Sequence, residues 1–312
     1  MKRRRKQQAP LWHPRHWPAW LGVGLMRVAG HLPYSWVLRL GPWAGRIYAF
    51  LAPRRREIAR INIDRCFPER SESWRKALLK SHFENLGIAL LEVPFAWWAP
   101  RRRCEGRPGG FGEIHGLEHL QAAVARGKGV LLLSAHFNSP ELSGRLLGRR
   151  VPFVALYRRA NSPVMERVIR RARGQLLEQV ERRDLRNLLR ALKAGKVVWY
   201  AVDQNCSRRQ AVFVDFFGIP AATNPAAARL ARLTGAAVVP FHAVRRWDGK
   251  GYDLHLEPAW EGFPSGDLEA DTRRINQLVE RWARRVPEQY LWIHRRFRTR
   301  PRASDPPFYS RK

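Results

Sequence analysis

The sequence predicts an α/β fold, in which helices flank a central sheet. The chain has 312 residues, of which 45% are hydrophobic and 11% aromatic, so it can bury a large core in one large or two small domains. Beyond residue 113, short apolar runs typical of buried strands alternate with segments typical of helices. Several helical segments open with Ser-Pro or Asn-Pro, a common helix start. This alternation is typical of layered α/β domains.

The net charge predicts anionic partners. Lys and Arg number 58 against 26 Asp and Glu, which gives a formal charge of +32. Nucleic acid, an anionic membrane face, a phosphorylated substrate and an acidic carrier protein all fit such a charge. The cysteines are Cys66, Cys104 and Cys206, with no CxxC or Cys/His ligand spacing. Disulfides and structural zinc are therefore disfavoured, and a reducing compartment is favoured.

The first segment, residues 1–55, predicts a basic, helical membrane anchor. After a basic start, apolar runs at 17–26 and 28–38 are interrupted by Arg27 and Arg39. Neither run reaches the roughly 18 apolar residues that a spanning helix needs. Tryptophan among arginines is typical of the headgroup boundary of a membrane, so we expect an interfacial anchor. An ordinary amphipathic core helix is the alternative. The tryptophans concerned are Trp12, Trp17, Trp20, Trp36 and Trp43.

Residues 56–110 predict a helical region. Apolar side chains from 73 to 98 recur every three to five residues, the spacing of one long helix. The segment 94–100 (PFAWWAP) is an aromatic cluster between prolines, and it fits either the lining of an acyl groove or a buried helix end. Residues 101–112 are charged and then glycine-rich, which indicates a linker or surface loop.

The α/β domain is expected at 111–301, followed by a tail at 302–312. Strands are predicted at 130–135, 152–157 and 197–202, with helices starting at Ser-Pro 139–140, Ser-Pro 162–163 and, after a longer loop, Asn-Pro 224–225. Gly195 and Gly235 are plausible helix stops. Two further strands are predicted at 236–244 and 252–258.

The chemistry candidate is His136 with Glu141, a His-x4-acid pattern at the end of the first of these strands. Roughly 0.8 such pairs are expected by chance in this composition, so the spacing alone is weak. Its position is more informative, because open α/β sheets bind ligands at the carboxyl ends of their strands. There His136 can accept a proton while Glu141 fixes its tautomer. A core histidine beside a glutamate that only complements the helix dipole is the alternative.

Other chemistries lack their sequence signals. The chain has no Gly-x-Ser-x-Gly elbow and no cysteine in a catalytic setting, which disfavours a covalent acyl-enzyme. It has no Walker A loop or Gly-x-Gly-x-x-Gly fingerprint, and no metal is implied. The nucleophile we expect is therefore a hydroxyl group of the substrate.

Several segments together resemble the late acyltransferases of lipid A biosynthesis, with the lauroyltransferase branch closest. They are the His136-x4-Glu141 pattern, Tyr157-Arg158, Asp203-Gln204, FFG at 216–218, AATN at 221–224 and EQYLWIHRRFRTRP at 288–301. The likeness also includes HPRHW at 13–17 and NIDRCFP at 62–68, so it covers almost the whole chain. It implies a central mixed sheet flanked by helices, as in glycerolipid acyltransferases. The family usually has a better membrane-spanning helix near the N-terminus, which leaves the topology open.

The resemblance implies an enzyme of the bacterial inner membrane that faces the cytoplasm. It would move an acyl chain from acyl carrier protein to a hydroxyl of Kdo-lipid IVA, with no cofactor and no metal. His136 matches the general base and Glu141 its partner. Arg158 matches a position with a phosphate or oxyanion role, or is a surface cation; Asp203 matches a structural or acceptor-positioning residue, or is a loop cap.

The basic C-terminal run and the whole-chain charge suit anionic substrates. Arg295, Arg296, Arg298 and Arg300 are candidates for contacts with the acceptor or the carrier protein, although a solvated tail explains them equally well. Two other functions stay open. One is acyl transfer to a lysophospholipid or another glycolipid; the other, more distant, is nucleic-acid binding, which the dense tryptophan of the N-terminal segment disfavours.

Overall fold

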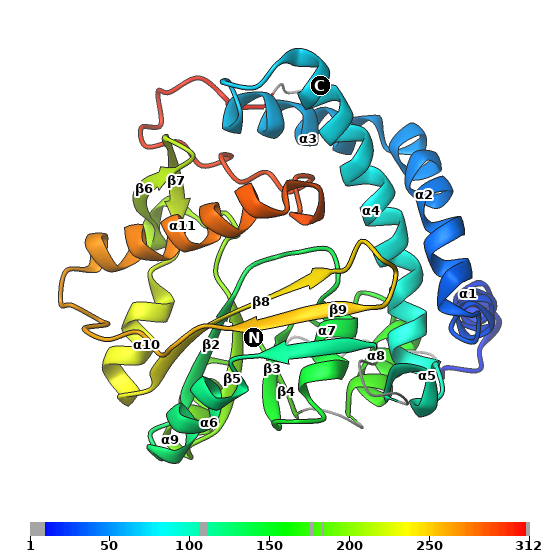
Figure 1. The fold of residues 1–312 in the computed structure, drawn as a ribbon, viewed down its shortest axis with the longest axis horizontal. Coiled ribbons are helices and arrows are strands. Elements are labelled where there is room, and N and C mark those ends of the chain that lie inside the picture. The colour runs from blue at the N-terminus through cyan, green and yellow to red at the C-terminus, as the bar shows by residue number, and fades with distance from the viewer. Residues whose placement is uncertain (1–9, 106–110, 175–177, 183, 310–312) are drawn as a thin grey trace, which may run out of the picture.

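The computed structural model describes residues 10–105, 111–174, 178–182 and 184–309 (Figure 1). A seven-stranded sheet has the order β1-β9-β8-β2-β5-β3-β4, and all its pairs are parallel except β8 with β9. The predicted α/β class with a mixed central sheet is therefore confirmed. The strands are β1 (Gly112–His115), β2 (Val130–Ser134), β3 (Phe153–Tyr157), β4 (Glu178–Glu181), β5 (Val197–Ala201), β8 (Ala237–Arg245) and β9 (Tyr252–Leu256), with a separate hairpin of β6 (Val212–Phe216) and β7 (Ile219–Thr223).

Helices cover both faces of this sheet. They are α1 (Trp17–Ala29), α2 (Tyr34–Leu51), α3 (Pro53–Cys66), α4 (Glu72–Trp98), α5 (Arg101–Glu105), α6 (Leu117–Ala125), α7 (Pro140–Leu147), α8 (Pro163–Gly174), α9 (Leu185–Lys193), α10 (Ala226–Thr234) and α11 (Leu268–Arg285), with short 3₁₀ turns η1 (Pro14–His16), η2 (Arg208–Gln210) and η3 (Pro287–Gln289).

The central strand β2 shows why the core has two halves. All five of its residues are buried. Leu131 and Leu133 pack into a cluster with α3, α10 and α11, whereas Val130 and Leu132 pack on the other face with α6 and α7. A parallel strand covered on both faces is a continuous apolar run, which is the pattern found at 130–133.

The expected helix signals are confirmed. Helices α7 and α8 start with proline after Ser139 and Ser162, and the side chain of Asn224 accepts the Ala226 N–H at the start of α10. Gly235 caps α10 in the left-handed conformation, and Gly195 follows α9 with a φ of 78°. Both conformations favour glycine.

The N-terminal helices form one body with α4. Figure 1 shows α1 and α2 on the outer side of α4, away from the sheet. Helix α2 approaches closely because glycine lies at the crossing: a Cβ at Gly41 would lie 2.5 Å from the Ile88 Cα. The division at residue 55 stays a prediction.

The loop expected at 101–112 begins with a helix and ends with a strand. Residues 101–105, which the sequence predicts as part of a loop, form the short helix α5, and Gly112 begins strand β1. The basic run at residues 2–6 and the centre of the predicted loop, 106–110, lie outside the described residues.

Candidate active site

Strand register brings His136 and Asp203 together at one edge of the sheet. Strands β2 and β5 pair in parallel, with Ser134 opposite Ala201. His136 and Asp203 each lie two residues beyond these positions. The two segments therefore leave the sheet side by side. The Nδ1 of His136 lies 2.6 Å from Asp203 Oδ1, and the His136 backbone N–H donates to the same oxygen at 3.0 Å. Asp203 is 4% exposed, whereas His136 is only partly buried.

The contact with Asp203 fixes the tautomer of the imidazole. An ionised carboxylate can only accept hydrogen bonds, so Nδ1 of His136 carries the hydrogen. The lone pair of the neutral ring is then on Nε2, which accepts a hydrogen bond from the side-chain amide of Gln204 at 2.9 Å. Nε2 is the atom that can take a proton from a substrate, in exchange for its contact with Gln204.

The pKa values of the pair are shifted in opposite directions. Burial opposes the charged form of His136, but the charge and hydrogen bond of Asp203 outweigh it, so its pKa is raised. Burial also opposes ionisation of Asp203, but His136 and a hydrogen bond from Tyr290 lower its pKa to about 2. Asp203 is therefore ionised at neutral pH and stabilises the imidazolium that forms when His136 takes up a proton.

The C-terminal segment holds the loop that carries His136. The Leu291 N–H donates to the His136 carbonyl at 3.1 Å, and the Asn138 N–H donates to the Gln289 carbonyl at 2.9 Å. On the other side, the Asn205 N–H donates to Nε2 of His294 at 3.0 Å. Burial lowers the pKa of His294 to about 4, so this ring is a neutral acceptor. The motif at 288–301 thus supports both loops of the site.

Glu141 does not contact His136, and this expectation is corrected. Its carboxylate accepts a hydrogen bond from Trp97 Nε1 at 2.8 Å and is ion-paired with Arg173 near the end of α8. Both ring nitrogens of His136 have other partners. At the start of α7 the Glu141 side chain points toward α4 and α8. The partner of His136 is instead Asp203, which the strand register brings next to it. Trp97, expected either in an acyl groove or in a buried helix end, is tied to this glutamate.

A buried ion pair lies beneath the start of α7. Glu92, fully buried in α4, accepts hydrogen bonds from Arg245 Nε at 2.9 Å and from the hydroxyl of Tyr252 at 2.7 Å. It also accepts one from the Ser139 hydroxyl, so this residue does not cap α7 through its side chain. Burial opposes ionisation of Glu92, but Arg245 outweighs it and its pKa is lowered. The pair thus holds Ser139, the residue directly before α7, in place.

Three predicted substrate-binding arginines have different surroundings. Arg158 directly follows β3 and is exposed at the same sheet edge as His136. Arg295 is partly exposed and lies over the ring of Tyr309. Arg296 is 3% exposed and donates to the Ala222 carbonyl at 2.8 Å, to the Thr223 hydroxyl and to the Asn276 side chain. A buried guanidinium of this kind cross-links the protein, so the expected substrate contact of Arg296 is corrected.

Several residues that the structure brings to the site have no distinguishing signal in the sequence. Arg173 belongs to a helix that contains several arginines, and the sequence pattern does not distinguish it from the others. Glu92 and Arg245 lie far apart in the sequence, and only the packing of α4 against the sheet brings them together. Gln204 belongs to the Asp203-Gln204 segment of the family resemblance, which predicts no role for it, and the structure places its side-chain amide on His136.

The candidate group of metal-ligating side chains lies away from this site. Among the described residues, Glu113, His115 and Asp253 are the group that offers ligand atoms within 4.8 Å of one another. They lie on edge strand β1 and its neighbour β9, and Arg246 forms ion pairs with both carboxylates. None of them lies on the strands that carry His136 and Asp203.

The fold and the geometry of the site point first to a class of protein. An imidazole with a carboxylate on one nitrogen and a lone pair on the other, at the carboxyl edge of an α/β sheet, is the arrangement that general-base catalysis needs. The comparison with protein families then names it: residues 4–299 match the model for "Bacterial lipid A biosynthesis acyltransferase". The chain belongs to this family of O-acyltransferases.

Individual relatives agree with the branch that the motifs indicate. The chain is 38% identical to the "Lipid A biosynthesis lauroyltransferase" of Escherichia coli over 95% of this chain and 96% of that protein. It is also 38% identical to the "Lipid A biosynthesis palmitoleoyltransferase" of E. coli, over 93% and 94%. Identity to the "Lipid A biosynthesis myristoyltransferase" of E. coli is 29%, over 96% and 92%. The predicted family is confirmed, and identity is higher to the lauroyl- and palmitoleoyltransferases than to the myristoyltransferase.

Proposed function

We propose that this protein transfers a fatty acyl chain, of lauroyl type, from acyl carrier protein to a hydroxyl group of Kdo-lipid IVA. Membership of the family and the 38% identity to lauroyl- and palmitoleoyltransferases support the reaction. The observation that carries the proposal is the His136 imidazole, held on Nδ1 by buried Asp203 with the Nε2 lone pair at the sheet edge. Such a group activates a hydroxyl without a cofactor.

In the proposed mechanism, His136 Nε2 takes the proton of the acceptor hydroxyl as its oxygen attacks the thioester carbonyl. A tetrahedral intermediate forms, with negative charge on the former carbonyl oxygen. Its collapse forms the ester and breaks the carbon–sulfur bond, and the imidazolium returns the proton to the leaving thiolate. Asp203 stabilises the imidazolium throughout, because its carboxylate stays ionised.

The start of α7 is the proposed site of oxyanion stabilisation. Because the Ser139 hydroxyl donates to Glu92, it leaves the first-turn N–H groups of α7 without a side-chain cap. Uncapped N–H groups at a helix start favour negative charge, as the dipole also does. We propose the N–H groups of Glu141 and Leu142 as donors. Glu141 itself acts as a positioning residue that ties this turn to Arg173 and Trp97.

The N-terminal helices are proposed to dock on the inner leaflet of the bacterial inner membrane, with the site facing the cytoplasm. Residues 1–56 contain no Asp or Glu, which suits an anionic lipid surface. Large apolar side chains point to solvent along α1 and α2, among them Trp17, Leu21, Leu25, Trp43 and Phe50. Within the described part of the chain, no helix is long and apolar enough to cross a bilayer. Interfacial docking is the arrangement these features favour.

A transfer assay tests the reaction. Detergent-solubilised enzyme is incubated with acyl carrier protein thioesters of different lengths and Kdo-lipid IVA, and products are read by mass spectrometry. We expect one added acyl mass, and a loss of about 10²–10⁴-fold in rate for His136→Ala. His119→Ala, at a partly exposed histidine on α6, is the matched control. Near-normal turnover of folded His136→Ala would refute the mechanism; no product with any donor would refute the acceptor.

Vesicle sedimentation tests the membrane face. Leu21 and Leu25 are 68% and 65% exposed, so Leu21→Glu/Leu25→Glu leaves the core intact. We expect at least tenfold weaker binding to anionic vesicles, since each buried leucine contributes about 1.5–3 kcal/mol. Leu185→Glu/Leu233→Glu, which changes exposed leucines on α9 and α10, is the control. Release of the wild-type protein by high salt alone would contradict an apolar anchor.

A further inference from the structure

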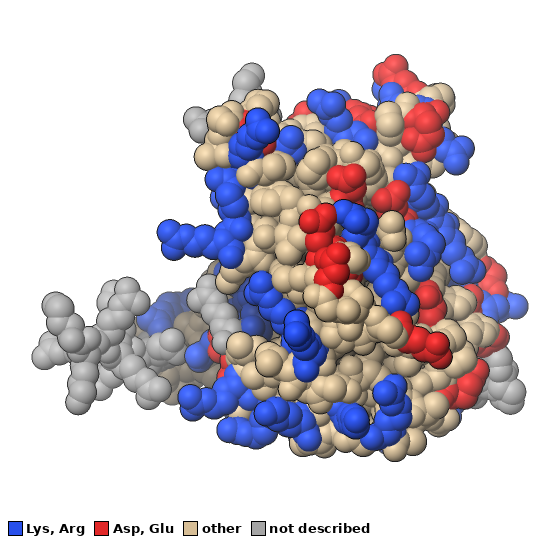
Figure 2. Space-filling view, turned by 90° about the vertical axis from the view of Figure 1, so that its left-hand side faces the viewer, with Lys and Arg blue, Asp and Glu red and all other residues tan. Residues whose placement is uncertain are grey.

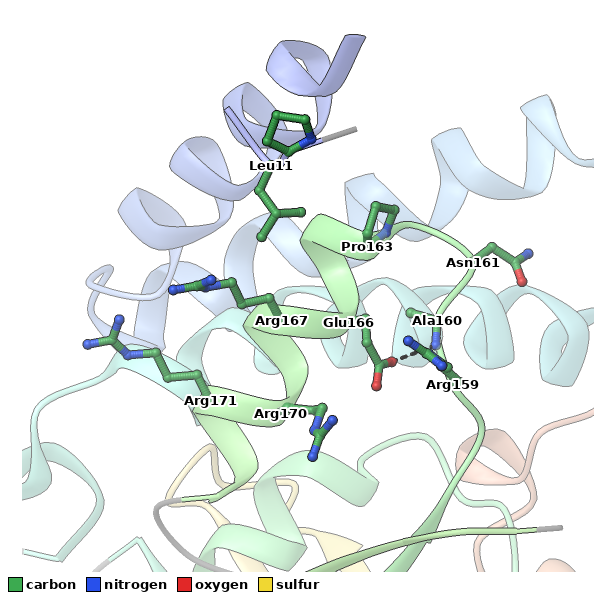
Figure 3. Close-up of a pocket in the computed structure, with 10 residues that line it drawn as sticks. Leu11, Arg159, Ala160, Asn161, Pro163, Glu166, Arg167, Arg170 and Arg171 are labelled. Atoms are coloured by element: carbon green, nitrogen blue, oxygen red, sulfur yellow. Dashed lines mark hydrogen bonds between the residues drawn. The ribbon is translucent and has the colours of Figure 1, made fainter. Parts of the chain in front are cut away.

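A second feature of the molecule is a cationic pocket between α8 and the start of the chain. Its volume is about 760 Å³, within the range of small-ligand sites. Arg159, on the loop before α8, and Arg167, Arg170 and Arg171, on the helix, line it, with Leu11 on the opposite wall. Figure 3 shows Arg167 and Arg171 extending from one side of α8 below Leu11.

The four guanidinium groups are available to a ligand. In the part of the chain that the structure describes, none of their side chains donates a hydrogen bond or joins an ion pair. The one carboxylate in the pocket lining, Glu166, is engaged: it accepts the Ala160 N–H at 2.8 Å and the Tyr157 hydroxyl at 3.2 Å. Four arginines thus line the pocket with one carboxylate, that of Glu166, which is hydrogen-bonded to the loop before α8. The pocket therefore has an excess of positive charge.

We infer that this pocket binds the phosphate groups of the anionic glycolipid acceptor. Guanidinium groups bind phosphate oxygens in pairs, and several of them at a concave site suit a ligand with more than one phosphate. From Leu11 the chain continues through exposed Trp12 into η1 and then α1, which begins at exposed Trp17. A ligand that is charged at the headgroup and apolar below it fits this junction. This inference rests on the proposed function.

The acidic carrier protein is the other anionic partner of the reaction, and the pocket suits it less. A protein partner generally contacts a broad surface of about 800 Å² rather than a pocket. The pocket also adjoins the face proposed to lie on the membrane, where a lipid headgroup is found and a soluble carrier protein is hindered. Excess cations alone do not decide the matter, because Figure 2 shows Lys and Arg spread over the opposite side of the molecule as well.

The test compares two double variants with equal loss of charge. Arg167→Gln/Arg171→Gln removes two pocket cations one helical turn apart. Arg229→Gln/Arg232→Gln removes two exposed cations from α10, at the other end of the molecule in Figure 1. In the transfer assay we expect the pocket variant to raise KM for the acceptor at least tenfold, with kcat and KM for the acyl carrier protein donor unchanged. The α10 variant is expected to match the wild type.

Binding is measured separately from turnover, so that failure of the proposed function is recognised. Neutral phosphatidylcholine vesicles carry the phosphorylated glycolipid, the same glycolipid without its phosphates, or phosphatidylglycerol, and inorganic pyrophosphate is added as a free competitor. We expect the pocket variant to bind tenfold more weakly only where the glycolipid carries phosphate. If the wild type shows this binding but transfers no acyl group, the proposed reaction fails and the pocket assignment stands.

Four results would overturn the inference. An unchanged acceptor KM together with unchanged binding would show that the pocket is not used. A raised KM for the donor alone would assign it to the carrier protein. An equal loss with phosphatidylglycerol would assign it to bulk lipid, and an equal effect in Arg229→Gln/Arg232→Gln would leave only the general charge of the protein.

Discussion

Replacing Asp203 with Asn tests the central feature of the site, the charged partner of His136. The amide keeps an oxygen that can accept the His136 backbone N–H, so the fold is expected to survive. The same oxygen lies 2.6 Å from Nδ1, but in the amide it is neutral, so the hydrogen bond from Nδ1 to a charged group is lost. Hydrogen bonds to charged groups contribute about 1.5–3 kcal/mol. At about 1.36 kcal/mol per factor of ten, Asp203→Asn is expected to lower kcat about 10–150-fold.

The pH profile separates this effect from structural damage. A general base is active in its neutral form, so wild-type activity rises with pH through the raised pKa of His136. In Asp203→Asn, burial is no longer opposed by the carboxylate, and the pKa of His136 falls. The acid limb of kcat therefore moves to lower pH while the plateau drops. Asp215→Asn, at an exposed position of β6, is the control. A lower plateau with an unmoved limb would refute the assigned role.

Stability has a matching pH window. The raised pKa of His136 stabilises the folded state at low pH, and this contribution is lost as pH rises through the folded-state value. The pKa of Asp203 is lowered to about 2, which stabilises the folded state at pH values above the usual pKa of aspartate, near 3.9. This contribution to stability is lost as pH falls toward about 2. The difference in Tm between wild type and Asp203→Asn is therefore expected to be largest between about pH 4 and 6.5. A difference that is constant with pH would contradict the pairing.

Two further predictions concern neighbouring side chains. If Glu141 acts through Arg173, Glu141→Gln and Arg173→Gln are not additive in kcat, and a double-mutant cycle gives a coupling of about 0.5–3 kcal/mol; additive losses would refute the contact. Arg296→Met leaves buried acceptors unpaired and is expected to lower the free energy of unfolding by about 1–3 kcal/mol in urea, with KM for the acceptor unchanged. Arg295→Gln, one residue earlier, is the matched control, and equal stability of the two variants would contradict the assignment.

The buried strands could be predicted from the sequence because burial on both faces leaves a continuous apolar run. The five predicted strands were found within two residues of their expected ends. Strand β4 was missed because it lies at the sheet edge, and of its four residues only Val180 is buried. The sequence predicts a loop where the β6–β7 hairpin forms. Its turn places Phe217 at a φ of 55° before Gly218, a position where asparagine or aspartate usually signals such a turn.

The site could be predicted only in part, because its key contact depends on strand order. The sequence placed His136 and Asp203 at strand ends, but nothing local shows that β5 lies between β2 and β3. The spacing of four residues between His136 and Glu141 instead favoured a contact that the start of α7 does not allow. Arg296 was misassigned for a related reason, since a run of arginines does not show which one is covered by α11 and β7.

The C-terminal motif is informative because its backbone holds the loop that carries His136. Tyr290 forms an isolated β-bridge with Phe137, directly after His136, and supplies a hydrogen bond to Asp203. The side chain of Asn62, on α3, donates to the carbonyls of Trp292 and His294 at 2.6 and 2.8 Å, and so fixes this segment against the helical layer. His136, the proposed general base, is thus positioned by three parts of the chain: two strand ends and the C-terminal segment. A change in any of them is expected to alter the orientation of His136 before it unfolds the sheet, because the loops of the site depend on these few hydrogen bonds whereas the central strand β2 is buried on both faces.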